Sequence, residues 1–178
     1  MKTVLKIFGI ISILISLLTC SMSIYRAQRD KDDLAELQTQ IAEAKTQMAT
    51  LQDQVKSMTG ESKTELDAEI AKIEKMIDSV PSASTYTIVQ ALLIVLVVLS
   101  LVFAVLLFKS NAKLSKQLFF AAVILTIVAF FVSPDLERGQ YSGLPSRTLA
   151  LLSGIPVVIG GLFAILIANK SLPKNSIN

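Results

Sequence analysis

The apolar positions in the middle of the chain repeat with spacings that alternate between three and four residues. This repeat fills four consecutive heptads, at Leu34, Leu37, Ile41, Ala44, Met48, Leu51, Val55 and Met58. Such spacing is typical of a helix that buries one seam against another helix. Twelve acidic and eight basic residues lie between residues 26 and 79. The pattern therefore predicts a coiled-coil segment in water.

The repeat breaks near Gly60, a residue type that suits the left-handed conformation at a helix end. Ser62 and Glu65 then match a capping box, in which each side chain satisfies a free amide of a new helix. The three-four spacing resumes one residue out of step, at Leu66, Ile70, Ile73, Ile77 and Val80. We predict a hairpin of two helices with its turn at Gly60–Glu65. The alternative is one long helix with an irregular heptad.

A hairpin folded about Ser62 would leave part of the first helix beyond the end of the second. The unpaired positions are Leu34, Leu37 and Ile41. Apolar patches exposed to water usually mark an interface. We therefore predict that these three residues, called the interaction stripe below, contact a second copy or another protein. The alternative is that the connection at residues 81–86 covers them.

The sequence outside this region is strongly apolar, and 52% of all 178 residues are hydrophobic. Apolar runs occupy residues 7–25, 87–108, 118–132 and 148–168, and a membrane-spanning helix needs about 17–25 residues. We predict an all-α membrane protein with about four transmembrane helices and an extracytoplasmic coiled-coil hairpin between the first and the second. Its parts are an N-terminal anchor or signal peptide (1–25), the hairpin (26–85), a three-helix transmembrane domain (86–170) and a cytoplasmic tail (171–178).

The first apolar run has two main interpretations. Two lysines precede it, and Ser21-Met22-Ser23 follows it as a small-x-small sequence, so it also fits a cleaved signal peptide. Its length equally fits a retained anchor, which we favour. A third interpretation is acylation of Cys20, although Thr19 is a poor match to the small residue that usually precedes such a cysteine. These alternatives stay open at the level of sequence.

The last apolar run carries the residues that distinguish it from the others. Pro156 lacks a backbone donor and should kink this helix. Gly160, Ala164 and Ala168 form a small-xxx-small stripe, which lets a neighbouring helix approach closely. Packing is the ordinary reason for such a stripe, and a hinge is the alternative.

Charge separates the connections into two groups. Seven lysines and no acidic residue lie in the N-terminal segment, in the loop at 109–117 and in the tail, whereas all fourteen acids lie at 26–79 and 134–147. Basic residues in short loops mark the cytoplasmic side. The N-terminus and C-terminus are therefore predicted to be cytoplasmic, and residues 26–85 periplasmic or extracellular. The localisation that fits is a bacterial inner membrane.

Little in the sequence points to catalysis. There is no His, only one Cys, and no ionisable residue within the predicted spans. Ser100, Ser153, Thr126 and Gln90 are isolated and are interpreted as contacts between helices. We expect a non-catalytic protein without cofactor or metal, whose partners are membrane lipid and either a second copy or another membrane protein, and not nucleic acid.

The predicted role is that of a membrane scaffold or assembly protein acting through its coiled coil. The alternative is a sensory or transport-accessory subunit that signals through the kinked last helix.

Overall fold

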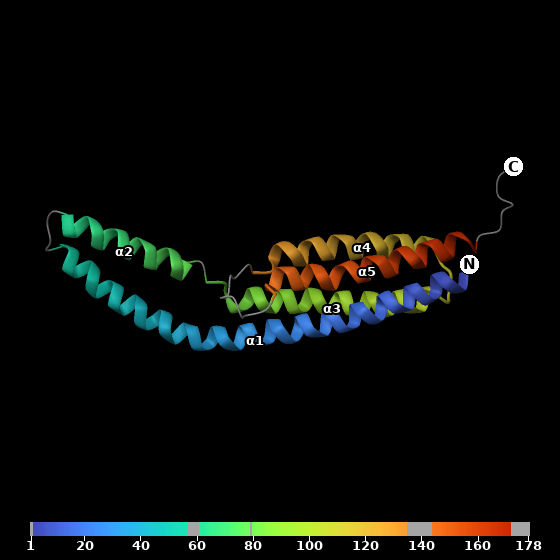
Figure 1. The fold of residues 1–178 in the computed structure, drawn as a ribbon, viewed down its shortest axis with the longest axis horizontal. Helices are drawn as coiled ribbons and strands as arrows, with labels where there is room; N and C mark the ends of the chain where they lie inside the picture. Colours follow the sequence, from blue (N-terminus) through green and yellow to red (C-terminus); the bar gives the residue numbers. More distant parts are fainter. Residues whose placement is uncertain (1, 57–60, 79, 135–143, 172–178) are drawn as a thin grey trace. The chain divides into compact units, whose positions relative to one another are not determined.

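The computed structural model describes residues 2–56, 61–78, 80–134 and 144–171, and these contain five α-helices and no strand (Figure 1). The helices are α1 (Lys2–Lys56), α2 (Glu61–Asp78), α3 (Ala83–Leu106), α4 (Ala112–Val132) and α5 (Ser146–Asn169). All but α2 are long and apolar enough to cross a membrane. The predicted all-helical class and four apolar spans are confirmed, and together they indicate an integral membrane protein.

The chain divides into two compact units. One, called the bundle, comprises residues 1–28 and 84–178, and the other, called the α1–α2 unit, comprises residues 29–83. The helix α1 contributes its first half to the bundle and its second half to the α1–α2 unit. In the bundle, the first half of α1, drawn in blue in Figure 1, lies next to α3, and α4 lies against α5.

Each span of the bundle buries one narrow stripe and leaves the rest of its surface exposed. On α3 the buried stripe includes Tyr86, Val89, Leu93, Leu96, Ser100 and Phe103, and Leu107 continues it just after the helix. On α5 it includes Ala150, Ser153, Val157, Gly160, Ala164 and Ile167. Both stripes repeat every three or four residues, the spacing of left-handed coiled-coil packing that is common among membrane helices. The exposed faces carry large aliphatic and aromatic side chains, as a surface in contact with lipid requires.

The buried face of α1 begins well before the predicted coiled coil. From Gly9 the buried positions are Gly9, Ile13, Ser16, Cys20, Ser23, Ala27, Asp30 and Leu34, again spaced by four and three. This series is in phase with Leu37, Ile41, Ala44, Met48, Leu51 and Val55. One helical stripe therefore runs from Gly9 to Val55 without a phase change. Its bundle half consists mostly of small and hydroxyl side chains, and its second half of larger apolar ones.

Small residues on α5 make room for large side chains of its neighbours. A Cβ atom at Gly161 would lie 2.7 Å from Cζ of Phe103 on α3, and one at Gly160 would lie 3.3 Å from Cγ1 of Ile13 on α1. A Cβ atom at Gly154 would lie 2.7 Å from Cβ of Thr126 on α4. Because α5 meets three different helices at these glycines, it is the helix around which the bundle packs.

Several helix boundaries differ from the predicted ones. The helix α4 begins six residues before the expected start at Leu118, because the side-chain oxygen of Asn111 accepts a 3.0 Å hydrogen bond from the Leu114 amide and caps the helix. The helix α2 begins at Glu61, one residue before Ser62. Of the predicted turn residues, Gly60 and the side chain of Ser62 lie outside the described residues, and Glu65 is exposed on α2.

The close approach of α4 and α5 at Gly154 generates the first testable expectation. Gly154→Ala should destabilise the protein by about 1–3 kcal/mol, because the new methyl group would overlap the β-branched side chain of Thr126. Thermal unfolding followed by circular dichroism in detergent measures this loss. Thr126→Ala removes Cγ2 and Oγ1, the two Thr126 atoms nearest the new methyl group, and leaves only Cβ close to it, so Gly154→Ala should cost less in that background. Equal losses in both backgrounds would contradict the proposed overlap.

Candidate functional site

Two hydroxyl pairs connect α1 to its neighbours inside the bundle. The Oγ atoms of Ser16 on α1 and Ser100 on α3 lie 2.6 Å apart, and both residues are completely buried. The Oγ atoms of Ser23 on α1 and Ser153 on α5 lie 2.7 Å apart. Hydrogen bonds of this kind orient membrane helices, because an apolar environment offers a hydroxyl no other partner than protein. The two pairs therefore fix which face of α1 is turned toward α3 and α5.

Side chains of α1 also approach backbone carbonyl groups of α5 in the two turns before Pro156. The Ser153 hydroxyl donates to the Leu149 carbonyl within α5 at 2.8 Å, and the Ser23 hydroxyl oxygen lies 3.2 Å from the same carbonyl oxygen. The Cys20 thiol lies 3.9 Å from the Ser153 carbonyl oxygen. Proline is tolerated within a membrane helix where neighbouring groups supply polar contacts to its backbone. The helix α5 continues through Pro156, and α1 approaches its backbone at Leu149 and Ser153.

Side-chain contacts connect the helices at both ends of the bundle. At one end, the Lys6 ammonium lies 5.1 Å from the ring centroid of Phe108, and the Ser171 hydroxyl donates to Ser110 at 3.2 Å. At the other end, the Gln90 side chain donates to Gln28 at 3.0 Å. The first of these ends is also where α3 stops and α4 starts, so the loop with Lys109, the N-terminal segment and the end of α5 lie together.

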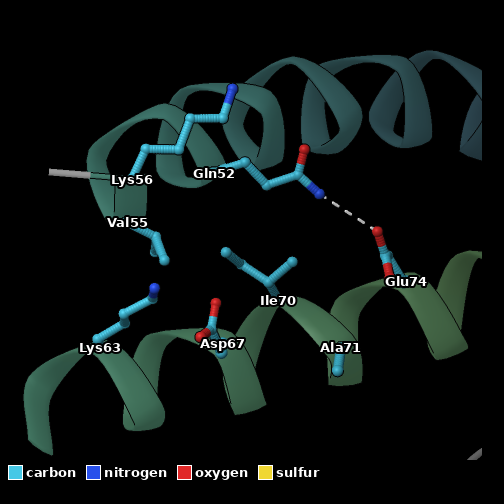
Figure 2. Close-up of a pocket in the computed structure, with 8 residues that line it drawn as sticks. All are labelled: Gln52, Val55, Lys56, Lys63, Asp67, Ile70, Ala71 and Glu74. Carbon is cyan, nitrogen blue, oxygen red and sulfur yellow. Dashed lines mark hydrogen bonds between the residues drawn. The ribbon is translucent and has the colours of Figure 1, made fainter. Parts of the chain in front are cut away.

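In the α1–α2 unit the two helices run antiparallel and make a side-by-side contact (Figure 2). Val55 of α1 and Ile70 of α2 point toward each other and are 6% and 7% exposed. The Gln52 amide donates to the Glu74 carboxylate at 3.3 Å.

An open pocket of about 400 Å³ lies between α1 and α2 around Val55 and Ile70. Its remaining lining is polar or small: Gln52, Lys56, Lys63, Asp67, Ala71 and Glu74. Lys56 forms an exposed 2.9 Å ion pair with Asp53, which raises the pKa of the lysine through the hydrogen bond and the carboxylate charge. The two helices thus share a core that is only one apolar layer deep.

The residues of the predicted interaction stripe differ in exposure. Leu34 is buried, with 3% of its surface exposed, whereas Leu37 is 42% exposed and Ile41 is half-buried. Leu37 is the large hydrophobic residue of the α1–α2 unit that is most accessible among those the structure describes. The accessible part of the interaction stripe therefore consists of Leu37 and Ile41.

The residues singled out on the last span face the bundle interior. Gly160, Ala164 and Ala168 are buried, and Gly160 lies against Ile13 of α1. Phe8 of α1 stacks on Phe163 nearby, with ring centroids 6.2 Å apart. The neighbour that approaches α5 along this stripe is thus α1. Pro156 itself is half-buried.

The polar residues interpreted as contacts between helices are confirmed in that role. Ser100, Ser153 and Gln90 hydrogen-bond to α1, and Thr126 packs at Gly154 of α5. Sequence reasoning missed their α1 partners Ser16, Ser23 and Gln28. The heptad phase, extended upstream from Leu34, would have found Ser16 and Ser23.

Within the described part of the chain, no three His, Cys, Asp or Glu side chains gather as metal ligands. Comparison with protein families, with curated proteins and with solved structures found no match.

The contact between Val55 and Ile70 can be tested by shortening one partner. Ile70→Ala should weaken the α1–α2 contact by about 2 kcal/mol, because it removes buried apolar atoms and leaves a gap. Local opening would then be roughly 30-fold more frequent. Trypsin digestion of the membrane-embedded protein should cut at Lys72 correspondingly faster. The control is Glu69→Ala, at an exposed neighbouring position, which should leave the rate of tryptic cleavage unchanged. An unchanged cleavage rate in Ile70→Ala would contradict the contact.

Proposed function

We propose that this protein is a non-catalytic integral membrane scaffold whose coiled-coil region mediates assembly with a second copy of itself. The observation that carries the proposal is the α1 stripe between Leu34 and Val55. It follows a coiled-coil repeat, yet α2 is too short to pair with all of it. Leu37 stays 42% exposed on this stripe, and Ile41 is half-buried. Apolar side chains presented in heptad phase fit the seam of another helix.

The residues that flank the stripe favour a like partner. At these positions α1 carries mostly glutamine, with one lysine: Gln38, Gln40, Lys45, Gln47, Gln52 and Gln54. In a parallel pair of identical helices the flanking positions of the two chains face each other. Uncharged glutamines avoid the like-charge repulsion that identical charged residues would create there. A heterologous partner docking on the same stripe is the other outcome of the test below.

The orientation in the membrane that fits this role places the α1–α2 unit outside the cytoplasm. Lys6 and Lys109 lie at one end of the bundle, near the end of α5 that precedes Lys170. Basic residues gathered at one end favour a cytoplasmic location for that end. A bacterial inner membrane, with residues 26–85 in the periplasm, is the setting we propose.

The test replaces the accessible apolar residues of the stripe with charges. Leu37→Asp combined with Ile41→Asp should abolish crosslinked oligomers in native membranes, because two carboxylates would be buried in each seam. The matched control is Thr39→Asp with Ala42→Asp, which adds the same charge on the opposite face of α1 and should leave oligomers intact. Unchanged crosslinking in the Leu37/Ile41 variant would contradict self-association. Loss of a crosslink to a different protein instead would identify a heterologous partner.

A second candidate function is a sensory or transport-accessory subunit, and the observation that favours it is the contact of α1 with α5 beside Pro156. Ser23 hydrogen-bonds to Ser153, three residues before Pro156, so a movement of α1 would bear directly on the proline-containing turn of α5. In this role the α1–α2 unit would report an external state through α5.

Hydrogen exchange separates the two candidate functions. For a scaffold, backbone exchange in the α5 turn around Pro156 should be the same in wild type and in the Leu37/Ile41 variant. For a sensor, the variant should alter exchange there several-fold, and Pro156→Ala should suppress the difference by restoring a backbone hydrogen bond. Mass spectrometry of peptides from α5 provides the measurement.

A further inference from the structure

The first span, residues 7–25, has three sequence-based fates: retention, removal after Ser23, or acylation at Cys20. The contacts of its buried face distinguish them. We infer that residues 1–23 remain in the mature protein as a structural helix of the bundle, held by the hydroxyl pairs to α3 and α5, and that neither cleavage after Ser23 nor acylation of Cys20 takes place.

The buried polar side chains of the first span match polar side chains of α3 and α5. Ser16 and Cys20 are completely buried and Ser23 is 4% exposed, so the polar atoms of this span face protein and not lipid. Their partners, Ser100 and Ser153, are equally buried on α3 and α5. Removal of residues 1–23 would turn the Ser100 hydroxyl toward lipid without its partner. An apolar solvent makes such an exposure unfavourable.

The surface of the first span also matches the shape of its neighbours. Gly9 on α1 leaves space for Leu107, the residue after α3, with a Cβ position 2.8 Å from Cδ2 of that leucine. Conversely, Gly160 on α5 receives Ile13 of α1. Gaps and side chains thus interlock in both directions along this interface. A signal sequence that functions only in targeting needs an apolar core and has no need of such complementary packing.

The possible cleavage sequence is part of a continuous helix. Ser21-Met22-Ser23 lies within α1, which continues unbroken from residue 2 to residue 56. Proteases act on exposed and locally unfolded segments, whereas here Ser23 is hydrogen-bonded to both Ser153 and Leu149. Cys20 is equally inaccessible, because its thiol faces the Ser153 carbonyl within the bundle. An acyl chain on this sulfur would have no route to the lipid.

The first experiment is the intact mass of the full chain, purified from membranes through a C-terminal affinity tag. The expected mass includes residues 1–23 without any acyl group. A mass lower by residues 1–23, or one that begins at an acylated Cys20, overturns the inference.

The second experiment asks whether the retained segment is packed as described. Because the two hydroxyl oxygens lie 2.6 Å apart, Ser16→Cys with Ser100→Cys in a Cys20→Ala background places two sulfur atoms within bonding reach. Mild oxidation should link α1 to α3 nearly completely, and a protease digest analysed without reductant should show the linked peptides. Ser21→Cys with Ser100→Cys is the matched control, because residue 21 is exposed on another face of α1, and it should give little product.

The outcomes are separable from those of the self-association test. A full-length chain that forms the Ser16–Ser100 crosslink supports the inference, whether or not the Leu37/Ile41 variant loses its oligomers. A full-length chain in which the crosslink fails, or in which the control pair links equally well, overturns it, because α1 would then be retained without being part of the bundle.

Discussion

The bundle depends on how closely α1 can approach α3 and α5 in a solvent that gives no hydrophobic reward for helix contact. Lipid tails are as apolar as leucine, so association requires tight packing and polar contacts between helices. This protein uses both. The Oγ atoms of the two hydroxyl pairs, Ser16–Ser100 and Ser23–Ser153, are 2.6 and 2.7 Å apart. In addition, glycines on α1 and α5 leave space for large side chains of the neighbouring helices. The remaining faces of the spans are free to be uniformly apolar.

The same helix follows a different rule in its second half. The α1–α2 unit carries most of the charged residues of the chain, and for such a segment in water the burial of apolar surface provides the stabilisation. Accordingly the stripe on α1 changes from small and hydroxyl residues to Leu, Ile, Met and Val, while its spacing stays constant. The core there is small, with Val55 and Ile70 buried beside an open pocket. Thin cores of this kind gain much from an additional helix, which is consistent with the proposed assembly role.

Much of the architecture was predictable because long apolar runs and heptads are strong signals. The four apolar spans follow from hydrophobicity and length. What could not be predicted has identifiable physical causes. The start of α4 depends on the N-cap Asn111, and the preference of asparagine for this position is a weaker sequence signal than hydropathy. The bundle half of the α1 stripe was missed because Ser16, Cys20 and Ser23 do not look like core residues by the standards of a water-soluble protein. In lipid, they are the residues that pack. Residues that contact each other across the bundle, such as Gly154 and Thr126, are far apart in sequence, so no local sequence pattern predicts these contacts.

The unbroken phase of the stripe from Gly9 to Val55 has a consequence for how this helix can change in length. Each residue of an α-helix turns the chain by about 100°, so loss of one residue between Leu34 and Val55 would turn the later side chains of the stripe away from α2. Loss of seven residues there would keep the stripe in phase while shortening the helix by about 10 Å. Natural variation in the length of this segment should therefore occur in steps of seven, or of the eleven that also close on a helical repeat, and seldom in steps of one or two.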